Sequence, residues 1–337
     1  MTTLINHLVE PALLREIDEK RLIVEAKPED LRKLVMIYLE NDALISSALL
    51  EAGPSRKEQK ERKKKFREAN QSLVSAWEYA KGKFNGILDH NLILETAKRV
   101  DKANEGAYRS DNMRLQGDNI VMPVNGDKVS EQMDVLTLFA NDKRLHPVAK
   151  AGLLHLHFVR IHPLPEGNGR TSRLLQNLVL DAEGYAPVDI KKGEKMLYQR
   201  NLKEALRGFY ERENIQTGKH DERFLSALTN APPITESESR FLDYIATKVN
   251  MSADNLITEI DTMPKYRVVL EGNPEPGQIF AVKNAIRSYL SKLGRPGQVN
   301  LLRERGSMEI SGNLTQEDIA STIGKNYGPS FKIRQIR

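Results

Sequence analysis

The sequence predicts a mainly α-helical protein with a smaller mixed α/β domain towards its C-terminal end. Apolar residues recur at helical spacing through most of residues 28–212, whereas strand-like alternation is confined to short stretches. The chain has 337 residues, 39% of them hydrophobic, which is enough for two or three units with buried cores. We expect an N-terminal helical region at 1–85, a helical core at 86–215 and an accessory domain at 234–337.

Helix start and stop signals divide the first two thirds of the chain. Pro28-Glu29-Asp30 suits the start of a helix and Gly53-Pro54 ends it, while Gly184 is expected to cap the end of another helix. Met113 to Val124 alternates partly around a Gly-Asp-Asn turn, which predicts a short β-hairpin. The predicted helices cover residues 28–52, 66–82, 88–103, 128–142, 146–161, 171–183 and about 192–212.

The accessory domain follows Pro232-Pro233 and is expected to combine helices with β-like segments. Its last residues, 314–337, contain a polar cap, an Ile-Ala pair, a glycine turn and a basic end. This order is typical of a helix-turn-helix, so a winged-helix-like domain is one expectation and a packing or protein-interaction domain is the alternative. The predicted elements are helices near 237–250, 278–293 and 315–323 and a strand over Tyr266 to Leu270.

Composition excludes several classes of protein. The chain has no run of about 18 apolar residues, so we expect no membrane span. It has no cysteine, which excludes disulfides and thiolate chemistry, and its first 20 residues lack a signal-peptide core. A cytoplasmic protein is therefore expected. The net charge of +5 equals the excess in residues 261–337, where twelve Lys and Arg face seven Asp and Glu, and is too modest to require nucleic acid.

The segment HPLPEGNGRTSR, His162 to Arg173, predicts a phosphate-binding site between two helices. Gly167-Asn168-Gly169 leads into a helix, so backbone N–H groups and the positive end of the helix dipole converge there. Arg170 and Arg173 are one turn apart and can make forked hydrogen bonds to neighbouring phosphates. The segment therefore has the donors that a nucleotide triphosphate requires.

Two further residues of this segment supply reactive groups. Glu166 is an oxygen ligand suited to Mg²⁺, and His162 can accept a proton from an incoming hydroxyl. A zinc site that includes His155 and His157 is a rival interpretation. The spacing places these histidines on different helix faces, so His155 is expected to be structural.

The same segment resembles the signature HxFx(D/E)GNGRxxR of Fic-domain proteins. It matches at every position except Leu164, where the signature has a phenylalanine that serves packing. The resemblance covers about residues 30–215. The other segments that resemble the family, in the expected order, are GAYRSDNMRL (106–115), HPVAKAGLLHLHFVRIHP (146–163), RLLQNLVLDAEGY (173–185) and Tyr198.

The resemblance implies a protein adenylyltransferase, which moves AMP from ATP–Mg²⁺ to a Ser, Thr or Tyr hydroxyl of a target protein and releases pyrophosphate. Some relatives transfer a phosphate, UMP or phosphocholine, and such a group is the alternative within the family. The roles implied by position are general base for His162, Mg²⁺ ligand for Glu166, α-phosphate binding for Gly167, Asn168 and Gly169, and β- and γ-phosphate binding for Arg170 and Arg173.

Two other family features are implied by the resemblance. The hairpin at 113–124 would be the flap that aligns the target by main-chain pairing. Many relatives are inhibited by a helix with the pattern (S/T)xxxE(G/N), and the helix at about 41–52 carries Ser47 and Glu51 on one face, with Ala52 in place of Gly or Asn. Glu51 would then pair with Arg173, and in some relatives this glutamate also supports removal of AMP. The alternative is that Glu51 is an exposed charge on an amphipathic helix.

The competing hypothesis is a DNA-binding regulator that uses residues 234–337 and in which the helical core is secondary. Two further partners are possible expectations: DNA, bound through that domain, and a second copy of the chain in a homo-oligomer.

Overall fold

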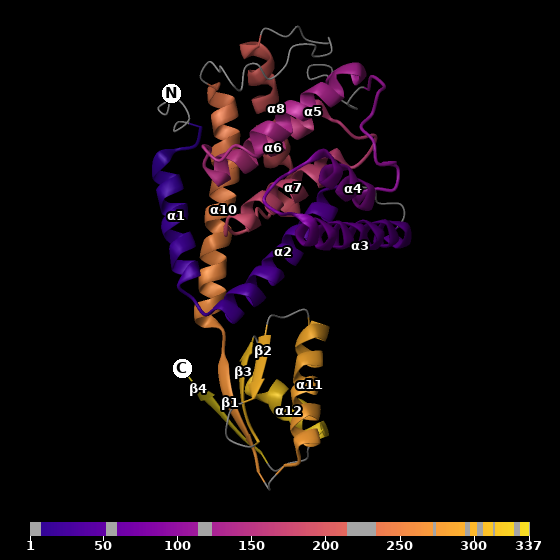
Figure 1. The fold of residues 1–337 in the computed structure, drawn as a ribbon. Coiled ribbons are helices and arrows are strands. Elements are labelled where there is room, and N and C mark those ends of the chain that lie inside the picture. Colours follow the sequence, from indigo (N-terminus) through magenta and orange to yellow (C-terminus); the bar gives the residue numbers. More distant parts are fainter. Residues whose placement is uncertain are drawn as a thin grey trace. The chain divides into compact units, whose positions relative to one another are not determined.

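The computed structural model describes residues 8–51, 59–113, 123–213, 234–271, 274–293, 297–301, 306–312, 314–326 and 331–336. The chain divides into two compact units, one of Met1–Arg21 with Glu40–Ala253 and the other of Leu22–Leu39 with Asp254–Arg337. The division falls inside α10, whereas the accessory domain is expected to begin at residue 234. The mainly helical fold class with a small mixed domain is confirmed (Figure 1).

All the regular secondary structure described in the first unit is helical. None of the described helices combines the length and apolar character needed to cross a membrane. Helices α1, α2 and α10 also extend into the second unit. The helices are α1 (Pro11–Glu25), α2 (Glu29–Glu51), α3 (Gln59–Lys83), α4 (His90–Val100), α5 (Val129–Ala140), α6 (Pro147–Ile161), α7 (Asn168–Ala182), α8 (Lys195–Arg212) and α10 (Glu236–Thr262), with 3₁₀ turns at Gly126–Lys128 and Lys192–Glu194.

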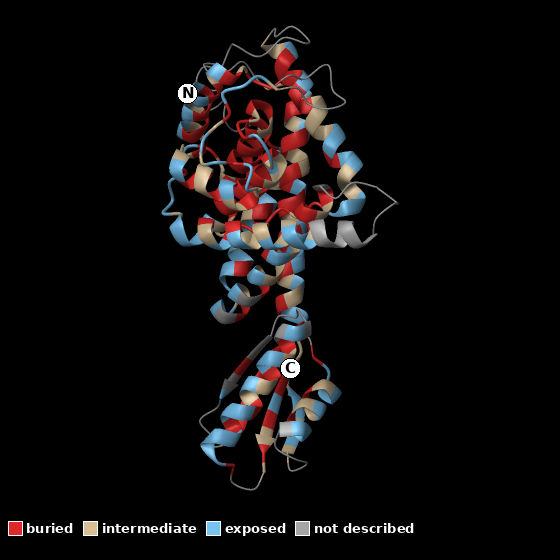
Figure 2. Ribbon diagram, turned by 90° about the vertical axis from the view of Figure 1, so that its right-hand side faces the viewer, coloured by how far each residue is buried: buried red, intermediate tan, exposed pale blue. Residues whose placement is uncertain are grey.

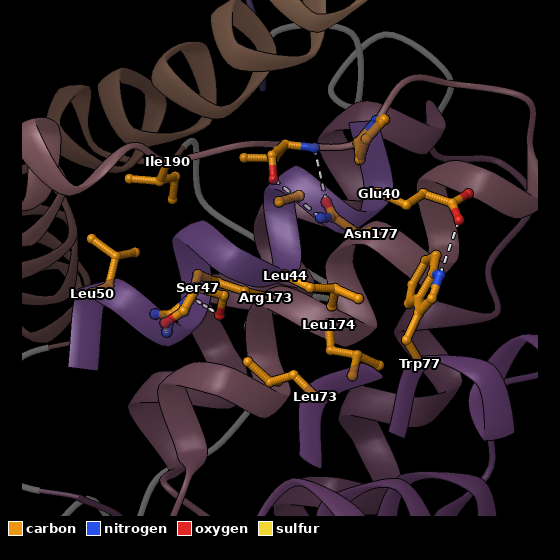
Figure 3. Close-up of a pocket in the computed structure, with 13 residues that line it drawn as sticks. Glu40, Leu44, Ser47, Leu50, Leu73, Trp77, Arg173, Leu174, Asn177 and Ile190 are labelled. Carbon is orange, nitrogen blue, oxygen red and sulfur yellow. Dashed lines mark hydrogen bonds between the residues drawn. The ribbon is translucent and has the colours of Figure 1, made fainter. Parts of the chain in front are cut away.

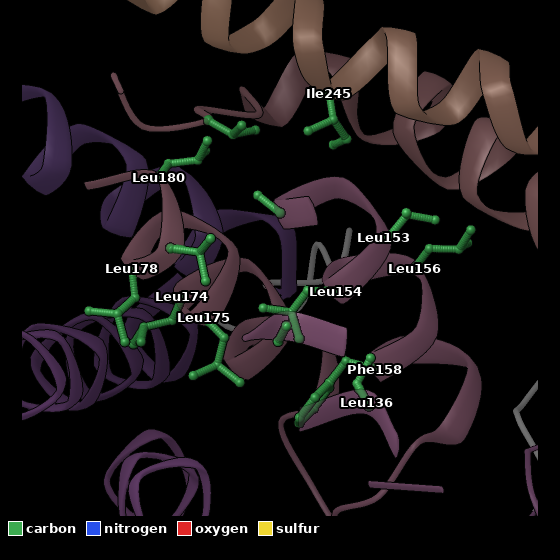
Figure 4. Close-up of a cluster of buried hydrophobic side chains, with 14 of the residues drawn as sticks. Leu136, Leu153, Leu154, Leu156, Phe158, Leu174, Leu175, Leu178, Leu180 and Ile245 are labelled. Atoms are coloured by element: carbon green, nitrogen blue, oxygen red, sulfur yellow. The ribbon is translucent and has the colours of Figure 1, made fainter. Parts of the chain in front are cut away.

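Helices α6 and α7 form the centre of the first unit, where buried residues concentrate (Figure 2). Helix α6 is apolar nearly all round, and Pro147 begins it next to His146, whose ring accepts a hydrogen bond from Val148 N at 3.2 Å. Leu154 and Phe158 of α6 pack in one cluster with leucines of α7 (Figure 4). Burial on every face explains why the sequence of α6 shows no polar stripe.

The ends of α7 show how glycine sets the helix limits. Gly167 precedes the helix with φ of 74°, so α7 starts at Asn168, three residues before the expected start. At the other end Gly184 has φ of 78° and Tyr185 N bonds Leu180 O at 2.9 Å, which confirms the expected cap. The earlier start places Arg170 in the first turn of the helix.

The second unit contains a four-stranded antiparallel sheet of order β2-β3-β1-β4. Its β-α-β-β-α-β connection is the ferredoxin-like arrangement. Buried side chains of both helices, among them Val282 and Ile319, share a cluster with Val268 and Ile310 of the sheet. The elements are β1 (Lys265–Leu270), α11 (Pro276–Leu293), β2 (Gly297–Leu301), β3 (Ser307–Gly312), α12 (Gln316–Asn326) and β4 (Phe331–Ile336).

Strand β4 differs from the winged-helix-like ending, which was one of the two expectations for this domain. The helix predicted near 315–323 exists as α12, but the next described residues pair with β1, with Ile333 opposite Val268. In β4 the apolar Phe331 and Ile333 alternate with Lys332 and Arg334, which is the period of a strand with one covered face. A helix-turn-helix needs a second helix at this point.

Truncating Leu154 to alanine is expected to lower the free energy of unfolding of the first unit by about 2–5 kcal/mol, because the cavity cannot close between α6 and α7. Leu154 is 0% exposed. A denaturant titration followed by Trp77 fluorescence reports on this unit, since Trp77 is the only tryptophan of the chain. Leu138→Ala is the control: the side chain is 73% exposed, and its change should stay within about 0.5 kcal/mol. Equal effects of the two variants would contradict the assignment of the core.

Candidate active site

The segment from His162 to Gly167 turns the chain between α6 and α7. His162 follows α6 in the left-handed region, with φ of 53° and ψ of 55°, and is the one non-glycine residue with positive φ in the described part of the chain. This conformation costs an L-residue about 1–2 kcal/mol. Its N–H still bonds Phe158 O at 2.9 Å. Contacts with the rest of the protein therefore hold His162 in a backbone conformation that an L-residue disfavours.

The half-buried imidazole of His162 is oriented by α6. Its Nδ1 lies 3.3 Å from Val159 O. A carbonyl oxygen can only accept, so this contact requires the proton on Nδ1 and leaves Nε2 as the nitrogen that can take up a proton. This is the tautomer that a general base requires.

The turn is braced from inside by Asn168. Its side-chain amide accepts from Leu164 N at 2.9 Å and donates to Leu164 O at 2.8 Å. Leu164 is 0% exposed and belongs to the main core, so leucine packs at the position where the signature has phenylalanine. A Cβ on Gly167 would lie 3.3 Å from the Val100 side chain. The glycine thus allows the turn to pack closely on the end of α4.

Glu166 presents an exposed carboxylate on a fixed backbone. Asn104, 1% exposed, donates from Nδ2 to Glu166 O at 3.1 Å and accepts from Glu166 N at 3.3 Å. Among the described residues no group of three or more His, Cys, Asp or Glu could hold a metal ion. Mg²⁺ commonly takes one or two carboxylates together with substrate phosphates and water, so Glu166 fits an ion that binds with a nucleotide.

Arg170 pairs with the end of α4. Its Nη2 lies 2.7 Å from Asp101 Oδ2, and its Nη1 donates to Val100 O at 3.3 Å. Sequence reasoning missed Asp101 and Asn104. Both lie more than 60 residues before their partners, and only the spacing of polar residues directly after an amphipathic helix could have drawn attention to them.

The structure brings Ser47 of α2 onto Arg173 of α7 (Figure 3). Arg173 is 6% exposed, and its Nε donates to Ser47 Oγ at 2.9 Å and its Nη2 to Ser47 O at 3.3 Å. The guanidinium also lies 6.0 Å from the centre of the Tyr198 ring. Glu51 is the last residue of α2, and its side chain lies outside the described residues. The Glu51–Arg173 pair therefore stays a prediction.

Other contacts hold α2 beside α3 and α7. Glu40 accepts hydrogen bonds from Trp77 Nε1 at 3.0 Å and Lys81 Nζ at 2.8 Å, and burial raises the pKa of its carboxyl. Lys195 Nζ donates to Leu50 O near the other end of the helix. A mostly apolar pocket lies along this seam (Figure 3). It is lined by Glu40, Ala43, Leu44, Ser47, Leu50, Leu73, Trp77, Arg173, Leu174, Asn177, Pro187, Val188 and Ile190.

His155 is structural, as expected. It is 0% exposed and lies between Gln176 Oε1 at 2.6 Å and Tyr198 OH at 2.8 Å. Burial lowers its pKa to about 3, so the ring is neutral at physiological pH. Residues 114–122, most of the expected flap, lie outside the described residues.

The model of the Fic/DOC family matches residues 87–180, which include the whole turn but not Ser47 or Glu51. The protein adenylyltransferase Fic of Drosophila virilis is 38% identical over 122 residues, which are 34% of this chain and 25% of that protein. The protein of the same name from Aedes aegypti is 38% identical over 123 residues, 34% of this chain and 24% of that protein. The matched part thus spans about a quarter of these relatives.

Two solved structures share the fold. A Fic-domain-containing signaling protein from Bacteroides thetaiotaomicron superposes with a TM-score of 0.56 at 21% identity, over 74% of this chain and 98% of that one. Fic-1 (residues 134–508) from C. elegans superposes with a TM-score of 0.52 at 20% identity, over 74% of this chain and 72% of that one.

Proposed function

We propose that the protein is an adenylyltransferase of the Fic/DOC family, whose model matches residues 87–180, and that it transfers AMP from ATP to a Ser, Thr or Tyr hydroxyl of a target protein. The observation that carries this proposal is His162, held in a braced turn with Nε2 as its proton acceptor. The similar proteins from Drosophila virilis and Aedes aegypti carry the name protein adenylyltransferase Fic, which supports this proposal.

In the proposed reaction the target hydroxyl oxygen bonds to the α-phosphorus of ATP while its proton moves to Nε2 of His162. The bond from the α-phosphorus to the oxygen that bridges to the β-phosphate breaks, and pyrophosphate leaves. The backbone N–H groups of Gly167, Asn168 and Gly169, at the N-terminus of α7, would stabilise charge on the α-phosphate oxygens.

Binding of the β- and γ-phosphates is assigned to Arg170 and Arg173. Each guanidinium would exchange a protein partner, Asp101 or Ser47, for phosphate oxygens. Glu166 would hold a Mg²⁺ ion together with those oxygens, and the ion, when bound, neutralises phosphate charge.

The proposed resting state depends on α2. The bonds from Arg173 to Ser47 occupy a guanidinium that the γ-phosphate requires, and Lys195 and Trp77 help to keep α2 in place. Glu51, one turn beyond Ser47, would add a carboxylate next to Arg173. Removal of AMP from the target with the help of Glu51 belongs to the same proposal.

The alternatives have less support. An enzyme that transfers another nucleotide or phosphate-containing group would use the same turn. The experiment below distinguishes such an enzyme from an adenylyltransferase. The hypothesis of a DNA-binding regulator requires a helix-turn-helix. In the described part of the second unit, strand β4 lies where the second helix of that motif would be. No observation favours it over the enzyme.

Mass spectrometry of the Glu51→Gly protein after incubation with Mg²⁺ and each of the four NTPs tests the proposal. We expect one adenylyl group on a hydroxyl side chain with ATP alone, and more of it than on the wild-type protein. Glu51→Gly with His162→Ala is the matched control and should stay unmodified. An adduct formed with a different NTP would mean that the protein transfers another nucleotidyl group. The absence of an adduct with all four NTPs would reject the proposed transfer. Equal modification of wild type and Glu51→Gly would reject inhibition by Glu51.

A further inference from the structure

A buried arginine outside the motif contacts the backbone on both sides of His162. Arg109 is 7% exposed and lies in the segment that follows α4. Its Nε donates to His162 O at 2.7 Å and its Nη2 to Ile161 O at 3.0 Å. Its backbone N–H donates to Pro163 O at 2.9 Å. Three successive carbonyls of the turn therefore bond one residue.

These carbonyls need partners from outside the helix. Ile161 is the last residue of α6, and the last carbonyls of a helix have no N–H within it to bond. The Ile161 and His162 carbonyls belong to the two peptide groups that flank the His162 Cα, so fixing both limits its φ and its ψ. A guanidinium can do this because its donors lie in one rigid plane.

The same side chain also contacts its own segment and one further segment. Arg109 Nη2 donates to Val124 O at 2.6 Å, and Nη1 donates to Asp111 O at 2.5 Å. Close by, Gly126 N donates to the Asn112 side chain at 2.8 Å, and a Cβ on Gly126 would lie 1.9 Å from Ser110 O. The segments at 109–112 and 124–126 are therefore in backbone contact beside the turn.

We propose that Arg109 is the positioning residue for His162: it holds both peptide groups around this residue, so that the strained left-handed turn keeps Nε2 of the imidazole directed at the substrate hydroxyl. The inference rests on the proposed function for the identity of that hydroxyl. The held conformation of His162 is a property of the protein without substrate. The conformation of His162 and the proposed transfer reaction can therefore be tested separately.

Arg109→Lys keeps the charge but replaces the planar fork by a single ammonium group, which cannot bond the two carbonyls in the same geometry. Assayed in the Glu51→Gly protein, kcat should fall by about 100-fold, as for a misplacement of about 1 Å. The Kd for ATP should change less than about twofold, because the phosphate-binding residues are held by other contacts. Arg144→Lys is the matched control, since Arg144 pairs with Asp142 on the surface and its side chain is 77% exposed; it should change neither value.

Nitrogen-15 NMR of labelled histidines gives a readout that requires no transfer activity. In the wild-type protein His162 should carry its proton on Nδ1 when neutral, and in Arg109→Lys it should become a mixture of tautomers. Its signals are assigned by their loss in His162→Gln. An unchanged tautomer in folded Arg109→Lys would overturn the inference, even if transfer were lost. The expected NMR change in a protein that transfers nothing would keep the inference and reject the proposed function.

If Arg109→Lys does not fold, Arg109→Ala refolded with methylguanidinium takes its place, with methylammonium as the control cation. Recovery of the Nδ1-protonated tautomer with methylguanidinium alone supports the inference. Equal recovery with both cations, or none with either, would overturn it.

Discussion

Replacement of His162 by alanine is expected to lower the rate of AMP transfer by about 10²–10⁴-fold, the usual contribution of a general base. The attacking hydroxyl would keep its proton, because the imidazole that is proposed to accept it is absent. Quantification of labelled AMP transferred from ATP in the Glu51→Gly background measures this loss. Binding of ATP should remain close to that of the parent, since the proposed role of the imidazole is towards the hydroxyl and not the phosphates.

His90→Ala is the matched control for that experiment. His90 contacts the Tyr108 hydroxyl and Asp134, and its side chain is 37% exposed, so its loss should leave transfer unchanged. Undiminished transfer by His162→Ala would reject His162 as the base. A parallel loss of ATP binding would mean that the substitution had disturbed the turn.

Arg173→Ala is expected to weaken ATP binding by about 10- to 100-fold, because charged hydrogen bonds to phosphate contribute about 1.5–3 kcal/mol. The same change removes the partner of Ser47, so it also removes one of the contacts that hold α2. Ser47→Ala separates these effects: it keeps the guanidinium and removes a hydroxyl that occupies it. Ser47→Ala should therefore strengthen ATP binding. Calorimetric titration of both variants with ATP should give a lower Kd for Ser47→Ala and a higher Kd for Arg173→Ala than for the parent.

Arg240→Ala is the control for loss of an arginine, since Arg240 lies on α10 with its side chain 62% exposed. It should bind ATP like the parent. Weaker binding by both Ser47→Ala and Arg173→Ala would contradict competition between α2 and the γ-phosphate. Unaltered binding by Arg173→Ala would reject its phosphate role.

The sequence predicted elements whose signal is local. Helix α6 was predictable because an apolar run follows Pro147, and the end of α7 because Gly184 has the conformation that only glycine adopts readily. Helix α1 was not predicted, since its many charged residues hide the few apolar ones, such as Ile17, that are buried. Strand β4 was not predicted, because the basic residues of this segment outweighed their alternation with Phe331 and Ile333.

Within the site, the residues of the turn were found because they are contiguous and their chemistry shows in the side chains. Asn104 and Arg109 were missed because each acts on backbone carbonyls of a distant segment. Every residue has a backbone carbonyl, so the sequence does not indicate which carbonyls Asn104 and Arg109 bond. Asp101 was missed for a related reason: its partner Arg170 was assigned to phosphate.

The left-handed backbone at position 162 restricts which residue could ever serve as the base there. Glutamate and lysine are also proton acceptors in enzymes, but among non-glycine residues only asparagine, aspartate and histidine are clearly enriched in this conformation. Of these, histidine alone combines that tolerance with an ordinary pKa near neutral pH. The geometry of the turn thus favours three side chains, and the need for a proton acceptor near neutral pH selects imidazole among them. Glutamate in place of His162 would carry the cost of the left-handed backbone, about 1–2 kcal/mol, in addition to the loss of the imidazole.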